Sequence, residues 1–238
     1  MIQHRTAIIH PEARLAGDVV VGAFAVIGAG VSIGRGCVLH PHVVIGDGAS
    51  IAEDCEIFPH AVIGREPKGA GATARNVTFE RRVTIGDGCS IGCSAVIYYD
   101  VAIGAGSLIG DSASIREQCR IGAQCIVSRC VTINYNTVIG DRVKVMDLTH
   151  LTGNMIIEDD VFVSTLVGSA NDNLVRAGFG DHVIGPKLRR GCVIGAGALL
   201  LPATEVGCDA TLGAGAVLTK NIPDGETWVG SPARPHHK

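Results

Sequence analysis

The stretch IGAGVSIGRGCVLHPHVVIGDGASI, residues 27–51, decides the fold, because a branched aliphatic residue stands at every sixth position in it. The same spacing extends over thirty positions in three runs, from Ile9 to Ile63, from Ile85 to Val163 and from Leu188 to Leu218. The residue four places after such an aliphatic is often small, as at Ala25, Cys37, Ala49, Cys55, Ala61, Ala95, Ala113, Cys119, Ala198 and Ala216. A strict period of this kind marks an internal repeat, which determines the whole architecture.

A period of six fits neither the 3.6-residue turn of a helix nor simple strand alternation. It fits a short strand followed by a two-residue corner, with three strands making one triangular coil. The aliphatic points inward, the small residue fills the corner, and glycine serves where φ is positive. The thirty positions predict about ten coils, which at about 4.8 Å per coil form a rod about 48 Å long. We therefore predict an all-β, parallel β-helix.

Composition agrees with a narrow prism, since 47% of the residues are hydrophobic but only 4% are aromatic. Bulky rings do not fit inside such a coil, so we expect the aromatic residues to line grooves or subunit contacts. Those off the inward ladder are Tyr98, Tyr99, Tyr135, Phe179 and Trp228. We expect one domain over residues 1–238, with a short tail at 223–238.

Charge and cysteine content exclude several classes of protein. The apolar content excludes a disordered chain, and no uncharged stretch supplies the roughly 20 apolar residues that span a bilayer. A net charge of −3 argues against a nucleic-acid surface. Nine cysteines without a CxxC pair favour a reducing compartment. We expect a soluble, cytoplasmic protein that binds neither nucleic acid nor membrane.

Two segments interrupt the repeat, at about residues 65–82 and 168–187, and loops of a solenoid often carry function. The first is basic, rich in Gly and Ala, and has no apparent apolar face. Guanidinium and ammonium groups clustered on a glycine-rich loop suit a diphosphate. The alternative for each segment is a solvated excursion without function. The cations of the first are Arg65, Lys68, Arg75, Arg81 and Arg82.

The hexapeptide pattern resembles the hexapeptide-repeat acyltransferases with a left-handed parallel β-helix. The resemblance implies left-handed coils, acetyl-CoA as donor, and a homotrimer with active sites between neighbouring prisms. Three features resemble the N-acetyltransferases that act on a nucleotide-linked amino deoxy sugar: Gly64-Arg65-Glu66-Pro67-Lys68, Asn171-Asp172-Asn173, and the ending GAGAVLTKNIPDGETWVGSPAR. The N-terminal half also resembles the acyltransferase that starts lipid A synthesis. That family has a His-Asp-Cys triplet where this chain reads Asn134-Tyr135-Asn136.

Polar residues on the coils before the second interruption are candidates for catalysis. His150 and Asn134 are 16 residues apart, close to the 18 of one coil, so we expect them to be neighbours on one face. An imidazole with a pKa near 6.5 is a suitable base for an ammonium group. In a second mechanism the leaving thiolate takes the proton, and polar groups only orient the sugar. The catalytic candidates are His150, Asn134, Asn154 and Asp172.

Further residues are candidates for binding. For the sugar nucleotide they are Arg65, Lys68, Arg75, Arg81, Tyr135, Asn171 and Asn173. For acetyl-CoA they are Lys187, Gly195, Gly213, Lys220 and Arg234, with turn amides near the two glycines for the pantetheine arm. His40, His42 and His60 are weaker candidates near the first interruption. We expect most cysteines to act as compact hydrophobes in the corners, and we expect no metal.

Two other functions remain open, because one fold hosts many activities. A zinc carbonic anhydrase needs three converging imidazoles, and the chain has no His-x4-His pair. Its remaining candidates, His150 and His182, fall on different elements. A non-catalytic scaffold or regulatory subunit needs neither a basic loop nor an Asn-Asp-Asn segment. Release of free CoA from acetyl-CoA distinguishes these functions from acyl transfer.

Overall fold

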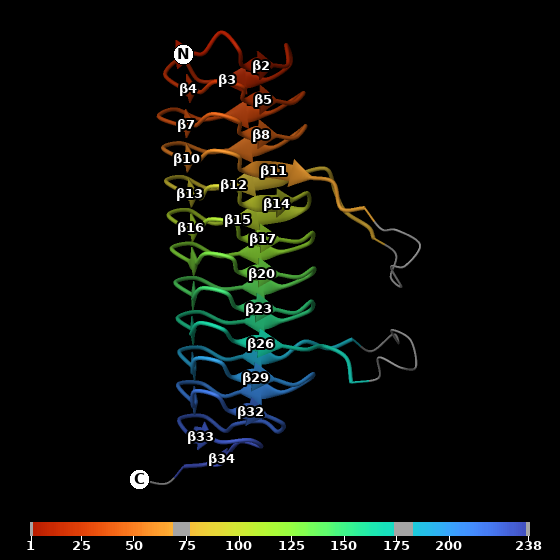
Figure 1. Ribbon diagram of the computed structural model, residues 1–238, viewed down its shortest axis with the longest axis vertical. Coiled ribbons are helices and arrows are strands. Elements are labelled where there is room, and N and C mark those ends of the chain that lie inside the picture. The colour runs from red at the N-terminus through yellow and green to blue at the C-terminus, as the bar shows by residue number, and fades with distance from the viewer. Residues whose placement is uncertain (1, 69–76, 174–182, 237–238) are drawn as a thin grey trace.

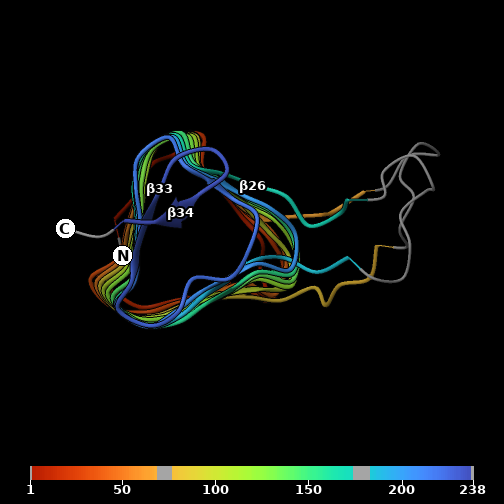
Figure 2. The ribbon, with the colours of Figure 1, turned by 90° about the horizontal axis from the view of Figure 1, so that it is seen from below.

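The computed structural model describes residues 2–68, 77–173 and 183–236. These residues form a rod with the chain ends at opposite tips (Figure 1). Seen along the rod, the coils superimpose as a triangle (Figure 2). Each side of the triangle is one sheet, here called A, B and C, and the chain visits them in that order in every coil except the last, which has no strand in sheet C. The fold is the predicted all-β, left-handed parallel β-helix.

The strands are short, most of them two residues long. Sheet A contains β1 (Ile2–Gln3), β4 (Val20–Val21), β7 (Val38–Leu39), β10 (Glu56–Ile57), β13 (Ser90–Ile91), β16 (Leu108–Ile109), β19 (Ile126–Val127), β22 (Lys144–Val145), β25 (Phe162–Val163), β28 (Val193–Ile194), β31 (Thr211–Leu212), β33 (Thr227–Val229) and β34 (Arg234–Pro235). Sheet B contains β2 (Ile8–Ile9), β5 (Val26–Ile27), β8 (Val44–Ile45), β11 (Val62–Arg65), β14 (Val96–Tyr98), β17 (Ser114–Ile115), β20 (Thr132–Ile133), β23 (His150–Leu151), β26 (Gly168–Ser169), β29 (Leu199–Leu200) and β32 (Val217–Leu218). Sheet C contains β3 (Arg14–Leu15), β6 (Ser32–Ile33), β9 (Ser50–Ile51), β12 (Val83–Ile85), β15 (Val101–Ile103), β18 (Arg120–Ile121), β21 (Val138–Ile139), β24 (Ile156–Ile157), β27 (Lys187–Leu188) and β30 (Glu205–Val206).

The aliphatic ladder forms the core. Ile97, for example, pairs in register with Ile63 in the coil before it and with Ile115 in the coil after it, and all three are fully buried. Parallel strands that bury one residue per face and coil explain why a branched aliphatic is required at every sixth position. The small corner residues are buried as well, including six free cysteines.

The rod has about twelve turns rather than the predicted ten. Sheet A contains twelve parallel strands, with β34 added antiparallel at its end. The prediction missed the outermost coils because their inward positions depart from the aliphatic rule. In β1 the inward position is Gln3. In β33 it is Trp228, which pairs with Leu212 of β31.

Three aromatic residues lie elsewhere than expected. Trp228 is not in a groove; it packs against the core at the end of the rod, where the coil closes with β34. Tyr98 and Tyr99 are buried beneath the start of the first interruption. The first interruption also has an apolar side, contrary to the prediction, because Phe79 stacks on Tyr99 with ring centroids 6.2 Å apart. Phe179 lies outside the described residues.

Both interruptions leave the rod at the same edge. The first follows β11 and returns at β12, and the second follows β26 and returns at β27, so each joins sheet B to sheet C. They project from one corner of the triangle (Figures 1 and 2), and four strands of sheet B, β14, β17, β20 and β23, lie between β11 and β26. Among the described residues, no helix has the length and apolar character needed to cross a membrane.

Candidate active site

The outward face of sheet B changes character between the two interruptions. The first outward position of each strand is apolar in the early coils and again in the late ones, but polar or glycine in between. The apolar members are Val26, Val44, Val62, Val96, Leu199 and Val217, and the intervening members are Ser114, Thr132, His150 and Gly168. A packed core does not require this change on an outer face, so a polar surface at this place is a candidate site.

The position after the inward aliphatic changes over the same coils. Sheet B has glycine there in the early coils, at Gly28, Gly46 and Gly64, and larger residues between the interruptions, at Tyr98, Arg116, Asn134 and Thr152. We use the term polar window for a group of outward-facing residues, of which Tyr98 and Thr152 are buried: Ser114, Thr132, His150, Tyr98, Arg116, Asn134 and Thr152. It lies beside the edge from which both interruptions project.

His150 lies half-buried in the middle of the polar window. Its Nδ1 is 2.7 Å from the hydroxyl oxygen of Thr132, in the coil before it. Burial lowers the pKa of His150 from its ordinary value of 6.5 because the charged form loses solvation. The imidazole is therefore neutral at pH 7, as a general base requires.

The strand register does not place His150 directly opposite Asn134. Thr132 in β20 lies opposite His150 in β23. Asn134 comes two residues after Thr132 and lies beside Thr152. Asn134 and His150 still share the outward face of sheet B.

Asn154 anchors the second interruption. Its side-chain amide donates to the carbonyl oxygen of Val183 at 2.8 Å, and its side-chain oxygen accepts from Asn136 at 2.8 Å. It occupies the left-handed region, with φ of 63°. These contacts favour a positioning role for Asn154 over direct participation in the reaction.

Tyr135 and Asn171 belong to the same corner. The Tyr135 ring lies over Gly153, where an added Cβ would come within 2.7 Å of the ring. The side-chain amide of Asn171 donates to the Gly153 carbonyl oxygen at 3.0 Å and lies 3.5 Å from the Tyr135 hydroxyl. Asp172 is half-buried and Asn173 exposed where the second interruption begins.

The basic residues of the first interruption separate to two sides. Arg65 extends β11 and stacks on Tyr98, with its guanidinium carbon 4.8 Å from the ring centroid. Arg81 forms an ion pair with Glu66 at 2.8 Å. Lys68 is exposed. Arg75 lies outside the described residues.

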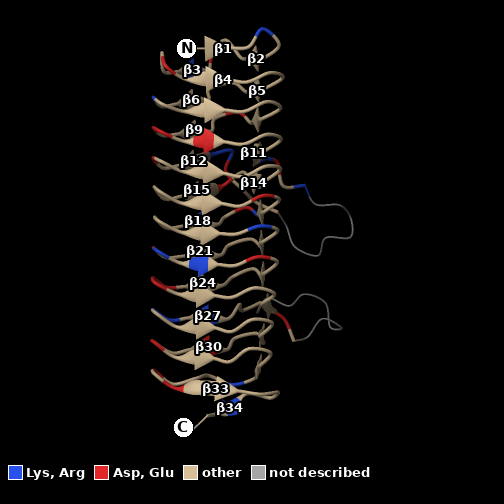
Figure 3. Ribbon diagram, turned by 60° about the vertical axis from the view of Figure 1, so that its left-hand side comes forward, with Lys and Arg blue, Asp and Glu red and all other residues tan. Residues whose placement is uncertain are grey.

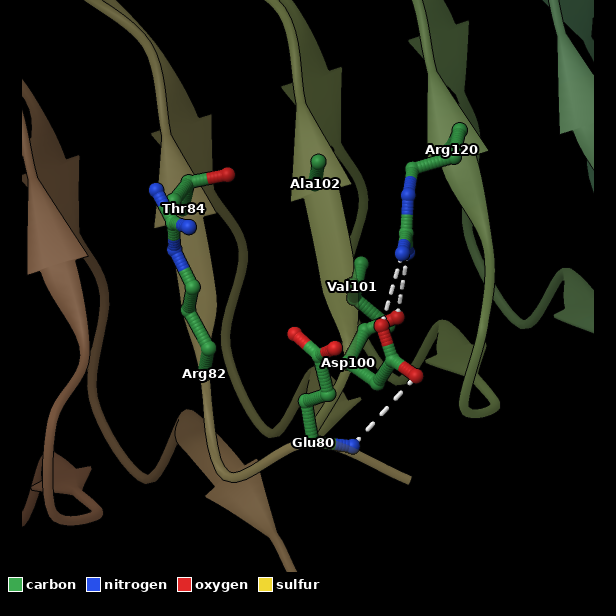
Figure 4. A pocket seen from close by; sticks show the side chains of 7 residues that line it. All are labelled: Glu80, Arg82, Thr84, Asp100, Val101, Ala102 and Arg120. Carbon is green, nitrogen blue, oxygen red and sulfur yellow. Dashed lines mark hydrogen bonds and ion pairs between the residues drawn. The ribbon is translucent and has the colours of Figure 1, made fainter. Parts of the chain in front are cut away.

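Arg82 lies on the other side of the edge, in a cavity of about 240 Å³ on sheet C (Figure 4). The cavity floor is Val101 and Ala102, and Arg120 in its wall donates to the Asp100 carboxylate at 2.7 Å. Two of its four charged residues, Asp100 and Arg120, form an ion pair, and the cavity contains no residue of the polar window. We therefore place the candidate site on sheet B.

The sequence analysis missed Tyr98 as a site residue, together with Arg116 and Glu117. Arg116 stacks on Tyr98 at 5.0 Å and donates to the buried Glu117 carboxylate at 2.9 Å. A signal was available in the sequence, because Gly28, Gly46 and Gly64 on three successive coils of sheet B give way to larger residues on the next four coils. Attention to interruptions of the ladder alone did not reveal it.

The acetyl-CoA candidates are scattered over the late coils. Gly195 and Gly213 lie at the corner between sheets A and B, and their amides donate to coil-to-coil hydrogen bonds with Leu212 and Trp228. Any turn amide that binds a pantetheine arm must therefore come from a neighbouring residue. Lys187 lies on sheet C, 3.8 Å from Glu158. The remaining two, Lys220 and Arg234, are exposed.

Most other charges gather on the edge opposite the interruptions, at the corner between sheets C and A (Figure 3). They are paired there, as Arg35 is with Glu53 at 3.2 Å and Arg142 with Asp160 at 2.7 Å. These ion pairs link successive coils and lie away from the polar window.

The early histidines lie at a third corner, between sheets A and B. His42 stacks between Phe24 and His60, at centroid distances of 5.0 and 4.8 Å. They are thus remote from the edge that carries the first interruption, contrary to expectation. Among the residues that the structure describes, no group of three metal-ligating side chains converges. His182 lies outside them.

The cysteines behave as expected from their corner positions. Burial raises the pKa of the Cys119 thiol to about 12, which keeps the sulfur protonated and unreactive.

Comparison with known proteins supports the acyltransferase resemblance. No family model matches the chain. A serine acetyltransferase of Buchnera aphidicola subsp. Acyrthosiphon pisum is 51% identical over 49 residues, which are 21% of this chain and 18% of that protein. The acyl-[acyl-carrier-protein]–UDP-N-acetylglucosamine O-acyltransferase of Saccharophagus degradans is 55% identical over 40 residues, 17% of this chain and 16% of that protein. The chain thus matches less than a fifth of the length of these curated relatives.

Solved structures agree in fold. The UDP-N-acetylglucosamine acyltransferase of Arabidopsis covers 99% of this chain, with 73% of its own length matched, at 22% identity and a TM-score of 0.62. The Bacillus cereus N-acyltransferase AntD covers 57% of this chain, with 82% of its own length matched, at 20% identity and a TM-score of 0.51. The chain therefore resembles the hexapeptide-repeat acyltransferases in both its repeat sequence and its fold.

Proposed function

We propose that this chain is a CoA-dependent acyltransferase that transfers an acetyl group from acetyl-CoA to the amino group of a nucleotide-linked amino deoxy sugar. The observation that carries the proposal is the polar window, with a half-buried neutral histidine between two interruptions of the solenoid. The relatives' names support the chemistry, since they include a serine acetyltransferase and UDP-N-acetylglucosamine acyltransferases. The AntD structure holds dTDP and coenzyme A together.

The reaction forms a bond between the amine nitrogen and the acyl carbon and breaks the bond from that carbon to sulfur. His150 accepts the amine proton, which finally passes to the thiolate. When Nδ1–H donates to Thr132, the lone pair of Nε2 faces the substrate. Asn134 supplies an amide donor to the oxygen that becomes negative. Asn154 and Asp172 hold the second interruption in place.

Binding is divided along the rod. The cations Arg65, Lys68, Arg75 and Arg81 attract the phosphates. Tyr135, Asn171 and Asn173 contact the sugar at the edge between sheets B and C. Acetyl-CoA lies along the late coils near Gly195 and Gly213, with Lys187, Lys220 and Arg234 as cations for its phosphates. No step requires a metal.

The chain acts as one β-helix domain within a homotrimer, in which a neighbouring prism closes the polar window. It acts in the cytoplasm, and its cysteines support a reducing compartment because all nine are free.

The test is release of free CoA from acetyl-CoA in the presence of nucleotide-linked amino sugars. We expect stoichiometric thiol release with at least one amino sugar and none with the matching sugar that carries a hydroxyl in place of the amine. Acetyl-CoA alone should raise the melting temperature. The proposal fails if no amino sugar releases thiol and acetyl-CoA does not stabilise the protein.

A further inference from the structure

Three side chains stack in a column at the first-loop end of the polar window. Arg65 pairs in register with Tyr98, and the pairing of Ile97 with Ile115 brings Arg116 beside Tyr98 from the next coil. The two guanidinium carbons lie 4.8 and 5.0 Å from the centroid of the Tyr98 ring. Since they come from the coils before and after Tyr98, the ring separates them.

The charges of this column are unequal. Arg116 donates to both carboxylate oxygens of Glu117, at 2.9 and 3.3 Å, and Glu117 is fully buried. Arg65 donates to the Tyr98 hydroxyl, and among the described residues no carboxylate forms an ion pair with it. The column thus keeps a net positive charge in a chain whose net charge is −3.

Building such a column is costly for stability alone. A buried carboxylate loses solvation, and its attraction to a cation often does no more than compensate for that loss. The corner that Glu117 occupies does not need a charged residue. The residue equivalent to Glu117 is Tyr135 in the next coil and Gly153 in the coil after that. A ligand that uses the fixed guanidinium groups accounts for the arrangement better than packing does.

The distance along the rod suits one ligand. Arg116 lies two strand spacings from the strand of His150, and Arg65 lies four, which is about 10 and 19 Å at about 4.8 Å per strand. These are distances between strands, and the long arginine side chains can reach across part of each. A sugar ring whose amine meets His150 would therefore place an attached diphosphate at the column and its nucleoside toward the first interruption.

We infer that Arg65, Tyr98 and Arg116 form the diphosphate receptor of the site, with Glu117 as a positioning residue that fixes the Arg116 guanidinium. The inference rests on the proposed function and adds a direction to it: the nucleotide lies toward the first interruption and the amine toward the second. Guanidinium groups bind phosphate oxygens in pairs of parallel hydrogen bonds. Because the Arg65 and Arg116 side chains are already held against Tyr98, they lose less conformational entropy when they bind a phosphate.

The test is calorimetric titration of the full chain with inorganic pyrophosphate, which needs no choice of nucleoside, followed by UDP and dTDP. We expect Arg65→Ala to weaken pyrophosphate binding at least about tenfold, since charge-assisted hydrogen bonds are lost. Arg116→Gln alone would remove the guanidinium that donates to the buried Glu117 carboxylate, which could destabilise the fold. The second variant is therefore Arg116→Gln with Glu117→Gln, for which we expect a similar loss.

The matched control is Arg35→Ala, because Arg35 is an exposed, ion-paired arginine on the opposite edge. It should leave pyrophosphate affinity unchanged, and melting curves should show that all variants are folded. Absence of pyrophosphate binding to the wild-type chain, or equal affinity in wild type and both site variants, overturns the receptor. Arginine-dependent pyrophosphate binding without thiol release from any amino sugar would instead keep the receptor and reject the proposed function.

Discussion

At the scale of single residues, His150 is the group on which the proposed chemistry depends most. His150→Ala should lower kcat by about 100-fold or more and leave KM for both substrates similar, because a general base acts mainly in the transition state. Thiol release at saturating substrate measures this. His10→Ala is the control, since His10 lies on the first coil far from the polar window. Turnover close to wild type in His150→Ala would assign the proton to the leaving thiolate.

The pH dependence follows from the burial of the same residue. Burial holds the pKa of His150 below 6.5. Because the base works in its neutral form, kcat/KM should stay on its plateau at pH 7 and fall only below about pH 6.5. The unfolded chain binds the proton more readily, so acidification through this range also lowers the stability of the fold. A pH–rate profile with its acid limb above pH 6.5 would contradict the assignment.

At the scale of elements, β16 offers a matched pair of adjacent residues. Ile109 is fully buried on the inward ladder, whereas Leu108 is 43% exposed. Ile109→Ala should lower the free energy of unfolding by about 2–5 kcal/mol, through lost burial and a cavity between stacked coils. Leu108→Ala should change it by no more than about 0.5 kcal/mol. Urea unfolding measures both, and equal losses would argue against the inward ladder as the main source of stability.

The anchor of the second interruption can be tested at Asn154. Asn154→Gly removes the hydrogen bonds to Val183 and Asn136 but tolerates the left-handed φ of 63°. Asn154→Ala removes the same bonds and adds backbone strain, so it should be less stable than the glycine variant by about 1 kcal/mol. Both should raise KM for the sugar nucleotide. An unchanged KM would show that the anchor does not shape the binding surface.

The strands and coils show which features of the fold can be predicted from the sequence. The period of six is a local signal, and it predicted the coil, the inward aliphatics and the buried cysteines correctly. Contacts between coils depend on the exact register, and there the sequence was less informative: it predicted Asn134 as a neighbour of His150, whereas the residue directly opposite His150 is Thr132. Trp228 was placed outside the ladder because its coil is shorter: Trp228 comes 16 positions after its partner Leu212 and not 18.

The site was predicted in part for the same reason. Arg65 and Asn154 were chosen from the sequence, but their partners Tyr98 and Val183 are about thirty residues away across an interruption of the repeat. The six-residue period does not continue through an interruption, so it cannot predict which residues on its two sides are paired. The contact between Arg116 and the buried Glu117 also breaks the usual composition of a corner, and only the structure revealed it.

At the scale of the whole molecule, the homotrimer is the first property to test. Exposed aliphatic side chains on early strands of sheet B, such as Ile8, Val26 and Val44, support burial against another copy. Sedimentation equilibrium should give about three times the chain mass of 24.6 kDa. A monomer at micromolar concentration would require a site complete within one prism.

The end of the rod carries a further consequence. A stack of equivalent coils presents open backbone groups at its last coil, and such an edge is a template for adding another chain. Here Trp228 fills the inward space of the last coil and β34 runs antiparallel to β33, in a direction that no further parallel coil can continue. The closing segment therefore covers the sheet A edge of the last coil, which disfavours end-to-end pairing of rods through that sheet.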